Sequence, residues 1–394
     1  MTDKELLALA ADFGTPTYVF DARAIADRVK RLAQALPSSV ELCYAIKANP
    51  FVLPILSPLV DRLEVCSPGE LDICGACSID PDQIVVSGVH KDEEAMRPLM
   101  QADVLPHRFT IESAAQLELI HRLARDAGVI APVLLRLSSG NQFGLDAREL
   151  RDIVDRRESH PHLDFRGVQF FSGTQKRRAR RLVREIERLG SFVESLRTEQ
   201  GWTASELEIG PGLPVAYFDS DSFDEGALLS ELSRALCDLP FEGSVSLEIG
   251  RSLVASCGTF LTSVVDAKTC AGQRYAIVDG GMNHLVYYGQ SMAMQLPPCR
   301  LLGSTERDGD AEPWNICGSL CSVNDILAKQ VPFSGLSLGD VIAFEDAGAY
   351  CMTEGISLFL SRDLPAVVLV GPDGEARLMR PHTPTHPLNS PVAR

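Results

Sequence analysis

The feature that most constrains the fold of this chain is a regular alternation of strand-like and amphipathic helical segments across residues 40–248. Short apolar, β-branched runs alternate with longer segments in which apolar residues recur at helical spacing. The eight expected strands lie near residues 40–46, 62–66, 84–88, 107–111, 132–137, 165–171, 206–209 and 244–248. Eight such units in about 230 residues fit an α/β fold of the (β/α)8 barrel type, and the pattern alone also fits a doubly wound parallel sheet.

A change of pattern near Cys257 predicts a C-terminal all-β domain. Helical periodicity fades there, and short strand-like runs such as residues 274–278 and 340–344 alternate with glycine-rich turns. The expected parts are a barrel at residues 22–256, a β domain at residues 1–21 and 257–380, and a disordered, proline-rich tail at residues 381–394.

The charge of the chain argues against nucleic acid as a partner. The formal net charge is −16 at pH 7, so the overall field repels a phosphate backbone. The basic run from Lys176 to Arg181 is a local exception. We interpret it as the solvated first turn of a helix that continues to about Arg197.

Neither the apolar segments nor the cysteines indicate a membrane or secreted protein. No 18 apolar residues run together, and the first residues lack the regions of a signal peptide. The eleven cysteines are irregularly spaced in a chain too long to need a disulfide framework, so we expect a cytoplasmic protein. Cys74 and Cys77 form a CxxC without a second pair at zinc-ribbon spacing. We interpret them as helix packing and expect no metal site.

One lysine stands out because it ends a predicted buried strand. The run from Val40 to Ile46 delivers Lys47 to its carboxyl end, just before the Asn49-Pro50 turn signal. Barrels and doubly wound folds place their chemistry at strand carboxyl ends, and a partly desolvated lysine amine can attack a carbonyl group. Taken alone, Lys47 also fits a lysine whose stem packs on the protein while its ammonium group reaches water.

The segment from Tyr44 to Asn49, Tyr-Ala-Ile-Lys-Ala-Asn, resembles the cofactor-lysine motif of one enzyme family. The family is that of the pyridoxal-phosphate decarboxylases with an alanine-racemase-like barrel, which includes the ornithine and diaminopimelate decarboxylases. Further segments resemble the family in its own order: Glu64–Leu71, Gln142–Gly144, Gly167–Gln175, Gly210–Gly212, Glu248–Arg251, Asp279–Gly281, Cys321–Asp325 and Gly348–Tyr350. The resemblance implies the barrel rather than the doubly wound sheet, and pyridoxal 5′-phosphate as cofactor.

The resemblance also implies which residues hold the cofactor. Lys47 matches the lysine that carries it as a Schiff base, and Glu248 matches the glutamate that pairs with the pyridine nitrogen. Phe171 stands where the family has a histidine stacked on the ring, so it can pack there but cannot form the hydrogen bond. The remaining expected contacts, mostly to the phosphate, are Arg136, Thr174, Gly210, Gly212, Arg251 and Tyr350.

Glu248 favours decarboxylation over two alternatives. A carboxylate there keeps the ring nitrogen protonated and the ring strongly electron-withdrawing. Alanine racemases place an arginine at that nitrogen, which favours simple proton exchange instead. The other alternative is a relative that binds or regulates without catalysis, but Lys47, the glycine loop and Cys321 are all retained here.

Cys321 matches a family segment that reaches across a dimer interface into the active site of the neighbouring chain. Thiols are mostly protonated at neutral pH, so Cys321 can return a proton to the substrate α-carbon. The resemblance therefore implies a homodimer with shared active sites, in which Cys321 of one chain serves Lys47 of the other. We interpret Cys317, four residues earlier, as a core residue.

The substrate is expected to differ from that of the diamino-acid enzymes. Ser322 follows Cys321 where those enzymes carry an acidic residue for the distal ammonium group, and His284, four residues before Tyr288, replaces an arginine that holds the distal carboxylate of diaminopimelate. A buried ammonium group without a partner would cost several kcal/mol. The sequence thus predicts an α-decarboxylase of an L-amino acid or amino-acid conjugate, for example a citryl-linked amino acid of siderophore biosynthesis. Carrier-bound aminoacyl groups and free diaminopimelate, ornithine or lysine are the alternatives.

Overall fold

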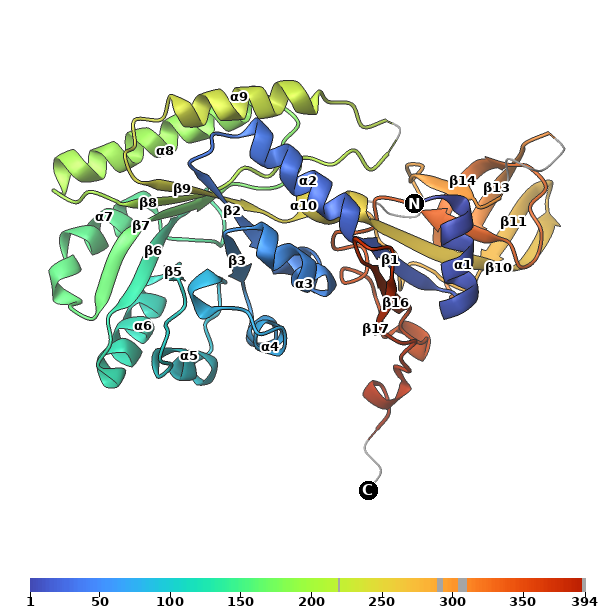
Figure 1. The fold of residues 1–394 in the computed structure, drawn as a ribbon, viewed down its shortest axis with the longest axis horizontal. Helices are drawn as coiled ribbons and strands as arrows, with labels where there is room; N and C mark the ends of the chain where they lie inside the picture. The colour runs from blue at the N-terminus through green and yellow to red at the C-terminus, as the bar shows by residue number, and fades with distance from the viewer. Residues whose placement is uncertain (219, 289–292, 304–309, 392–394) are drawn as a thin grey trace. The chain divides into compact units, whose positions relative to one another are not determined.

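The chain divides into two compact units (Figure 1). The structure is a computed structural model that describes residues 1–218, 220–288, 293–303 and 310–391. We call Arg28–Pro214 with Phe223–Leu253 the barrel unit, and Met1–Asp27 with Val215–Ser222 and Val254–Arg394 the β unit. The short segment Val215–Ser222 thus groups with the β unit, although the sequence analysis placed it in the barrel.

Among the residues that the structure describes, eight parallel strands close the barrel unit. They are β2 (Val40–Ala45), β3 (Arg62–Val65), β4 (Ile84–Val86), β5 (Arg108–Ile111), β6 (Ala131–Leu137), β7 (Leu163–Phe171), β8 (Glu206–Gly210) and β9 (Ser244–Ile249). The last strand pairs back with the first, with Val40 opposite Val245. The predicted (β/α)8 barrel is therefore confirmed, and the doubly wound sheet is excluded.

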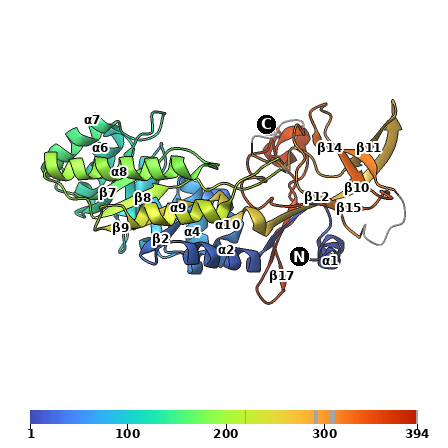
Figure 2. The same ribbon diagram turned by 90° about the horizontal axis from the view of Figure 1, so that it is seen from above.

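Helices surround the barrel strands (Figures 1 and 2). They are α2 (Ala22–Ala35), α3 (Leu53–Leu56), α4 (Pro68–Ala76), α5 (Glu93–Met100), α6 (Ala114–Ala127), α7 (Ala147–Asp155), α8 (Ala179–Glu199), α9 (Glu225–Cys237) and α10 (Arg251–Val254). In α6, for example, Leu117 and Ile120 belong to a buried apolar stripe. Ser113 caps the start of α6 by accepting a hydrogen bond from the Gln116 N–H, and Gly128 ends it with a left-handed φ of 71°.

The β unit is built on a mixed sheet, which confirms the predicted C-terminal β domain. Its strands are β1 (Thr17–Asp21), β10 (Gly258–Cys270), β11 (Gln273–Val278), β12 (Cys299–Leu301), β13 (Glu312–Cys317), β14 (Ile326–Phe333), β15 (Val341–Phe344), β16 (Ala366–Val370) and β17 (Ala376–Arg380). Strand β1 pairs antiparallel with β10 and parallel with β16, so the N-terminal strand joins two C-terminal ones.

A helix that was not predicted from the sequence, α1 (Asp3–Phe13), forms near the N-terminus of this unit. Thr2 and Glu5 make a reciprocal capping box at its start. Leu6 and Leu9 then pack into the buried core of the sheet. The helix forms because its apolar residues cover one face of the mixed sheet.

The segment after Arg380 is ordered by hydrogen bonds, where the sequence analysis expected disorder. His382 Nε2 lies 3.0 Å from the Pro16 carbonyl oxygen, and Thr385 Oγ1 donates to the Arg362 carbonyl oxygen at 2.9 Å. Thr385 is fully buried. Proline-rich composition therefore misled the prediction for residues 381–391, and residues 392–394 lie outside the described part of the chain.

The basic run before α8 is only partly solvated. Helix α8 starts at Ala179, and Lys176 precedes it with a buried side chain. Lys176 Nζ lies 2.7 Å from Glu185 Oε2 and 3.4 Å from the Gly210 carbonyl oxygen. The predicted solvated first turn is therefore wrong for Lys176, because an ion pair compensates its burial.

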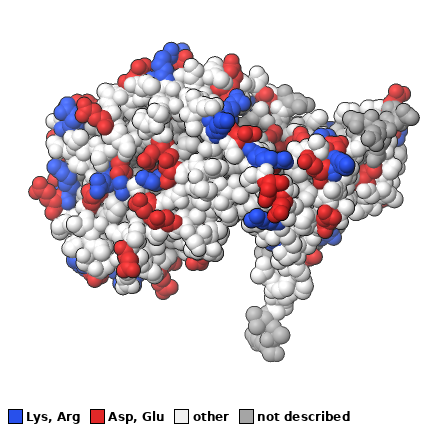
Figure 3. All heavy atoms as spheres, viewed as in Figure 1, with Lys and Arg blue, Asp and Glu red and all other residues white. Residues whose placement is uncertain are grey.

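Charged side chains of both signs are interspersed over the face of the protein seen in Figure 3. The net charge of −16 therefore does not gather into one acidic patch on that face. Within the described ranges, the structure contains no helix that is both long and apolar enough to cross a membrane.

Candidate active site

Lys47 lies directly beyond the carboxyl end of β2, in the short 3-10 helix Ile46–Ala48. The chain turns there because Asn49 caps the next 3-10 turn, with its Oδ1 accepting from the Phe51 N–H at 3.1 Å. Tyr44 anchors the turn by donating to the Asn49 carbonyl oxygen at 2.9 Å. The Lys47 side chain is 38% exposed, so the strand mouth leaves its amine accessible.

A buried carboxyl group, a half-buried one and a thiol surround the Lys47 amine. Nζ donates to Glu64 Oε2, from β3, and lies 3.7 Å from Glu248 Oε1, from β9. Cys66 Sγ lies 3.4 Å from Nζ and 3.2 Å from Glu64 Oε1. The structure therefore brings together Lys47 and Glu248, as the sequence analysis expected, and adds Glu64 and Cys66.

Burial and mutual repulsion divide the protons unequally among three carboxyl groups of the barrel. Burial and the charge of Glu64 raise the pKa of Glu208 to about 7 and the pKa of Glu248 to about 8. Burial also acts on Glu64, but the Lys47 ammonium group outweighs it and holds the pKa of Glu64 below its usual value. Gln169 Nε2 donates to Glu208 and lies 3.5 Å from Glu248 Oε2. These opposite pKa shifts favour an ionised Glu64 beside the Lys47 ammonium group and a protonated Glu248.

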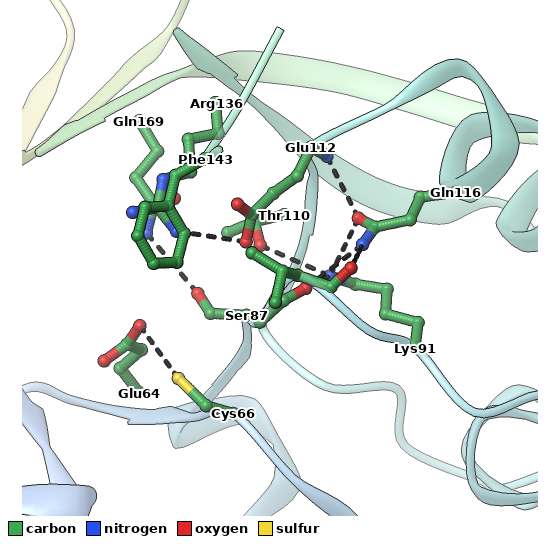
Figure 4. Close-up of polar contacts among 12 residues, drawn as sticks. Glu64, Cys66, Ser87, Lys91, Thr110, Glu112, Gln116, Arg136, Phe143 and Gln169 are labelled. Carbon is green, nitrogen blue, oxygen red and sulfur yellow. Dashed lines mark hydrogen bonds and ion pairs between the residues drawn. The ribbon is translucent and has the colours of Figure 1, made fainter. Parts of the chain in front are cut away.

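A second polar cluster lies in the barrel interior (Figure 4). Arg136 of β6 donates to Glu112 Oε1 at 3.0 Å, and its guanidinium group lies 4.8 Å from the centroid of the Phe143 ring. Lys91 is buried with Nζ 3.2 Å from Gln116 Oε1, and burial lowers its pKa to about 8. Arg136, which the sequence analysis assigned to the cofactor, is therefore oriented by Glu112 and Phe143.

The glycine loop after β8 packs backbone against backbone. Gly212 has a left-handed φ of 61°, and an ideal Cβ there would lie 2.1 Å from the Gly173 carbonyl oxygen. At Gly210 an ideal Cβ would lie 2.3 Å from Cδ2 of Phe171, so that ring covers the end of β8. The Lys176 N–H donates to the Gly212 carbonyl oxygen at 2.9 Å. These close approaches leave no room for a side chain at Gly210 or Gly212.

Two further predicted residues lie on segments next to this loop. The ideal Cβ position of Gly212 is 3.1 Å from Thr174 Cα. Arg251 is buried at the start of α10, directly after β9, which pairs with β8. The barrel unit thus gathers Thr174 and Arg251 around the same strand ends as the glycine loop.

Cys321 lies exposed in the loop between β13 and β14 of the β unit. Asp325 organises this loop, because its buried carboxylate accepts from the Leu320 N–H at 2.8 Å and the Met282 N–H at 2.7 Å. Gly318 makes room for that carboxylate, since an ideal Cβ there would lie 2.2 Å from Asp325 Oδ2. The loop therefore presents Cys321 to solvent on a fixed backbone.

The other predicted residues of the β unit differ in their access to a ligand. Ser322 is half-buried beside Cys321, and Tyr288 is 42% exposed. Tyr350 is half-buried with a left-handed φ of 64°. His284 is buried with Nε2 2.9 Å from the Asp363 carbonyl oxygen, and burial lowers its pKa to about 4. His284 is therefore neutral at pH 7, and its Nε2 contacts the backbone of Asp363.

The comparisons with known proteins decide the family. A family model described as "Pyridoxal-dependent decarboxylase, pyridoxal binding domain" matches residues 22–255, which include the whole barrel. This chain belongs to the pyridoxal-dependent decarboxylases. The diaminopimelate decarboxylase of Pseudomonas aeruginosa is 33% identical over 94% of this chain and 90% of that protein.

Two other pyridoxal-dependent decarboxylases show how widely the likeness extends. The L-glutamyl-(BtrI acyl-carrier protein) decarboxylase of Niallia circulans is 25% identical over 93% of this chain and 91% of that protein. The solved diaminopimelate decarboxylase of Helicobacter pylori, in complex with L-lysine, has a TM-score of 0.84 at 23% identity. The match covers 97% of this chain and 98% of that structure, and it shows a likeness of fold.

As a pyridoxal-dependent decarboxylase, the chain is an enzyme that uses pyridoxal 5′-phosphate to release carbon dioxide from an amino acid. The residues present fit this cofactor. The raised pKa of the Glu248 carboxyl group favours its protonated form, which offers a hydrogen to a basic ring nitrogen. The Lys47 amine lies 3.7 Å from that carboxyl group.

Several residues of this decarboxylase site were missed by the sequence analysis. Glu64 and Cys66 stand in the matched segment Glu64–Leu71, but no role was assigned to them. Glu208 and Gln169 carried a different signal, because each is a polar residue with an apolar neighbour on both sides in its strand. In a barrel such a residue faces the interior, so it indicates a polar core.

Replacing Gly212 with alanine should weaken binding of pyridoxal phosphate to this decarboxylase by at least about tenfold, or ~1.4 kcal/mol. The new Cβ would meet the Gly173 carbonyl oxygen at a left-handed φ, so the loop must shift. Gly69→Ala is the matched control, because an ideal Cβ there meets nothing within 4 Å. Cofactor retained in equilibrium dialysis measures the effect, and equal retention by the two variants would contradict a phosphate site at Gly212.

Proposed function

We propose that this decarboxylase removes the α-carboxyl group of an L-amino acid conjugate whose distal end carries no free ammonium group. The observation that carries the proposal is the arrangement of acidic groups in the Cys321 loop. Asp325 is the one acidic residue in the sequence from Gly318 to Asp325. Both of its oxygens accept backbone N–H groups, from Met282 and Leu320.

Asp325 is therefore committed to the loop and does not face a substrate. Ser322, beside Cys321, offers a hydroxyl where diamino-acid decarboxylases carry a carboxylate. A distal ammonium group buried against Ser322 would lack an ionic partner, at a cost of several kcal/mol. Free diamino acids would then be rejected, while an uncharged or conjugated distal end would be accepted.

Two classes of conjugate meet this requirement. One is a citryl-linked amino acid, as in siderophore biosynthesis, and the other is an aminoacyl group on a carrier protein, the kind of substrate named for the Niallia circulans relative. The net charge of −16 disfavours docking of an acidic carrier protein and so favours the small conjugate. Free diaminopimelate is the second candidate, because the Pseudomonas aeruginosa relative is named for it.

In this proposal the barrel residues hold the cofactor by the groups described above. Lys47 binds its aldehyde carbon, and Glu248 shares a proton with its ring nitrogen. Phe171 packs against the ring, and Arg136 is oriented toward the site by its ion pair with Glu112. The expected phosphate contacts from the barrel are Thr174, Gly210, Gly212 and Arg251, and the family resemblance adds Tyr350 of the β unit. When bound, pyridoxal phosphate draws electrons from the α-carbon as carbon dioxide leaves.

The α-carbon then needs a proton, and we assign its delivery to Cys321. The thiol is exposed on the ordered loop of the β unit, and thiols in general are protonated at neutral pH. We further propose a homodimer in which Cys321 of one chain serves Lys47 of its partner. Each active site would then need residues from both chains.

The replacement Ser322→Asp should raise kcat/KM for free lysine or ornithine by at least about tenfold, since a carboxylate beside Cys321 would pair with the distal ammonium group. Val323→Asp is the matched control, because Val323 is the next residue and is 87% exposed, so it adds the same charge to the same loop without facing a site. Steady-state carbon dioxide release is the readout. Equal gains from both variants would show a general charge effect and contradict the role of Ser322.

A further inference from the structure

Three side chains of the barrel unit that the decarboxylase reaction does not use converge on one point. Glu118 and His121 lie one turn apart on α6, and His160 lies in the loop before β7. One possible ligand atom from each lies within 4.8 Å of the other two. The three side chains meet near the amino end of β7. Phe171 is the last residue of that strand and lies about 26 Å from its amino end. The cluster is therefore remote from the cofactor residues.

The hydrogen bonds of Ser159 fix the tautomer of His160. The Ser159 hydroxyl donates to the Arg156 carbonyl oxygen at 2.6 Å, so its hydrogen is already used. Ser159 Oγ, 3.2 Å from His160 Nδ1, must therefore accept a hydrogen bond from that nitrogen. The neutral ring then presents the lone pair of Nε2 to Glu118 Oε1, 3.3 Å away. Two lone pairs at this distance repel unless a cation lies with them.

His121 adds a second ring to the same point. Its ring packs edge-on against that of His160, with centroids 4.9 Å apart. His121 Nε2 is buried without a hydrogen-bond partner among the described residues. A proton shared by His160 and Glu118 would leave His121 unsatisfied, whereas a metal ion can satisfy all three groups.

The three possible ligand atoms lie within 4.8 Å of one another, and one pair already has the separation that a tetrahedral ion requires. Two ligands bound at about 2.0–2.1 Å from zinc lie about 3.3 Å apart, which is the observed separation of His160 Nε2 and Glu118 Oε1. The Glu118 side chain is 70% exposed and free to adjust, while that of His160 is 11% exposed and fixed. A cavity of about 590 Å³ opens beside the three groups and leaves space for a water ligand.

We propose that Glu118, His121 and His160 bind one divalent transition metal ion, zinc by the nature of its ligands, and that the ion ties α6 to the loop before β7. Two imidazoles, one carboxylate and a water form a common zinc ligand set. The site would stabilise the barrel unit rather than take part in decarboxylation. The cysteine spacing predicted no metal site. The local sequence could not indicate this one, because Glu118 and His160 are 42 positions apart and only the fold joins them.

The test is zinc titration of the holoenzyme after dialysis against a chelator, with bound metal counted by elemental analysis. Wild-type protein should bind one zinc per chain at this site and unfold at a higher temperature with zinc present. Glu118→Gln, His121→Ala and His160→Gln should each weaken this binding by at least about tenfold and lose the thermal shift. Decarboxylase activity should stay unchanged in all three.

The matched control is His162→Gln. The His162 ring lies 6.1 Å from that of His121, but its Nδ1 contacts the Val129 carbonyl oxygen at 3.1 Å, so it stands outside the ligand set and should keep the zinc. The absorbance spectrum of bound cobalt distinguishes this site from binding to the eleven cysteines, because thiolate ligands add charge-transfer bands that nitrogen and oxygen ligands lack.

Two outcomes would overturn the proposal. One is zinc binding that is equal in wild type and in the three variants, and the other is no binding at about 0.1 mM free zinc, a hundredfold excess over a micromolar Kd. Glu118→Gln keeps the test decisive if the histidine variants fail to fold, since its side chain is largely exposed.

Discussion

Replacing Lys47 with alanine should abolish covalent attachment of pyridoxal phosphate and lower kcat/KM by at least about 10³-fold, or ~4 kcal/mol in activation free energy. The amine at the end of β2 is the group placed to bind the aldehyde carbon, next to Glu248. Absorbance of the bound cofactor measures attachment. Reduction with borohydride followed by peptide mapping should label Lys47 in the wild-type enzyme.

Two variants separate attachment from charge and folding. Lys47→Arg keeps a cation beside Glu64, but a guanidinium group does not lose its proton and so cannot form the linkage. Lys329→Ala removes an exposed lysine from β14 and should leave the enzyme intact. Lys91 is another lysine whose amine could react with the cofactor aldehyde, because burial lowers its pKa to about 8. A borohydride label on Lys91 instead of Lys47 would refute the assignment.

Mixing two inactive variants, Lys47→Ala and Cys321→Ala, should restore activity if the sites are shared between chains. Random exchange makes about half of the dimers hybrid, and each hybrid holds one intact site of two, so about a quarter of wild-type activity is expected. Cys321→Ala alone should lose about 10²–10⁴-fold in rate, as expected for loss of a proton donor.

The control for this experiment mixes Lys47→Ala with Lys47→Arg. Those hybrids contain no intact lysine and should stay inactive under the same exchange conditions. Exchange itself can be followed with differently tagged chains. Absence of rescue in samples that demonstrably contain hybrids would show that Cys321 and Lys47 do not act across a dimer.

The barrel could be predicted because its strands are short buried runs bounded by turn residues. The expected strand at residues 165–171, for example, corresponds to β7 (Leu163–Phe171). Lys47 could be placed at a strand mouth for the same reason, because the run before it is apolar and Asn49-Pro50 ends it. Pattern and structure agree wherever local sequence alone decides the element.

The polar interior of the barrel could not be predicted from local sequence. Glu208 and Gln169 are 39 positions apart and meet only because β7 and β8 are neighbours in the closed barrel. The raised pKa of Glu248 depends on burial in the closed barrel and on the charge of Glu64 on another strand. The structures of helix α1 and of the segment after Arg380 could not be predicted for a related reason, because packing against the sheet of the β unit determines them.

The most direct test of the proposed function compares kcat/KM for release of carbon dioxide from substrates labelled at the α-carboxyl group. Free diaminopimelate, lysine and ornithine form one set, and citryl-linked and carrier-bound amino acids form the other. We predict that at least one conjugate exceeds every free diamino acid by about 10²-fold or more, because Ser322 leaves a distal ammonium group unpaired. A higher kcat/KM for any free diamino acid than for every conjugate would contradict the proposal.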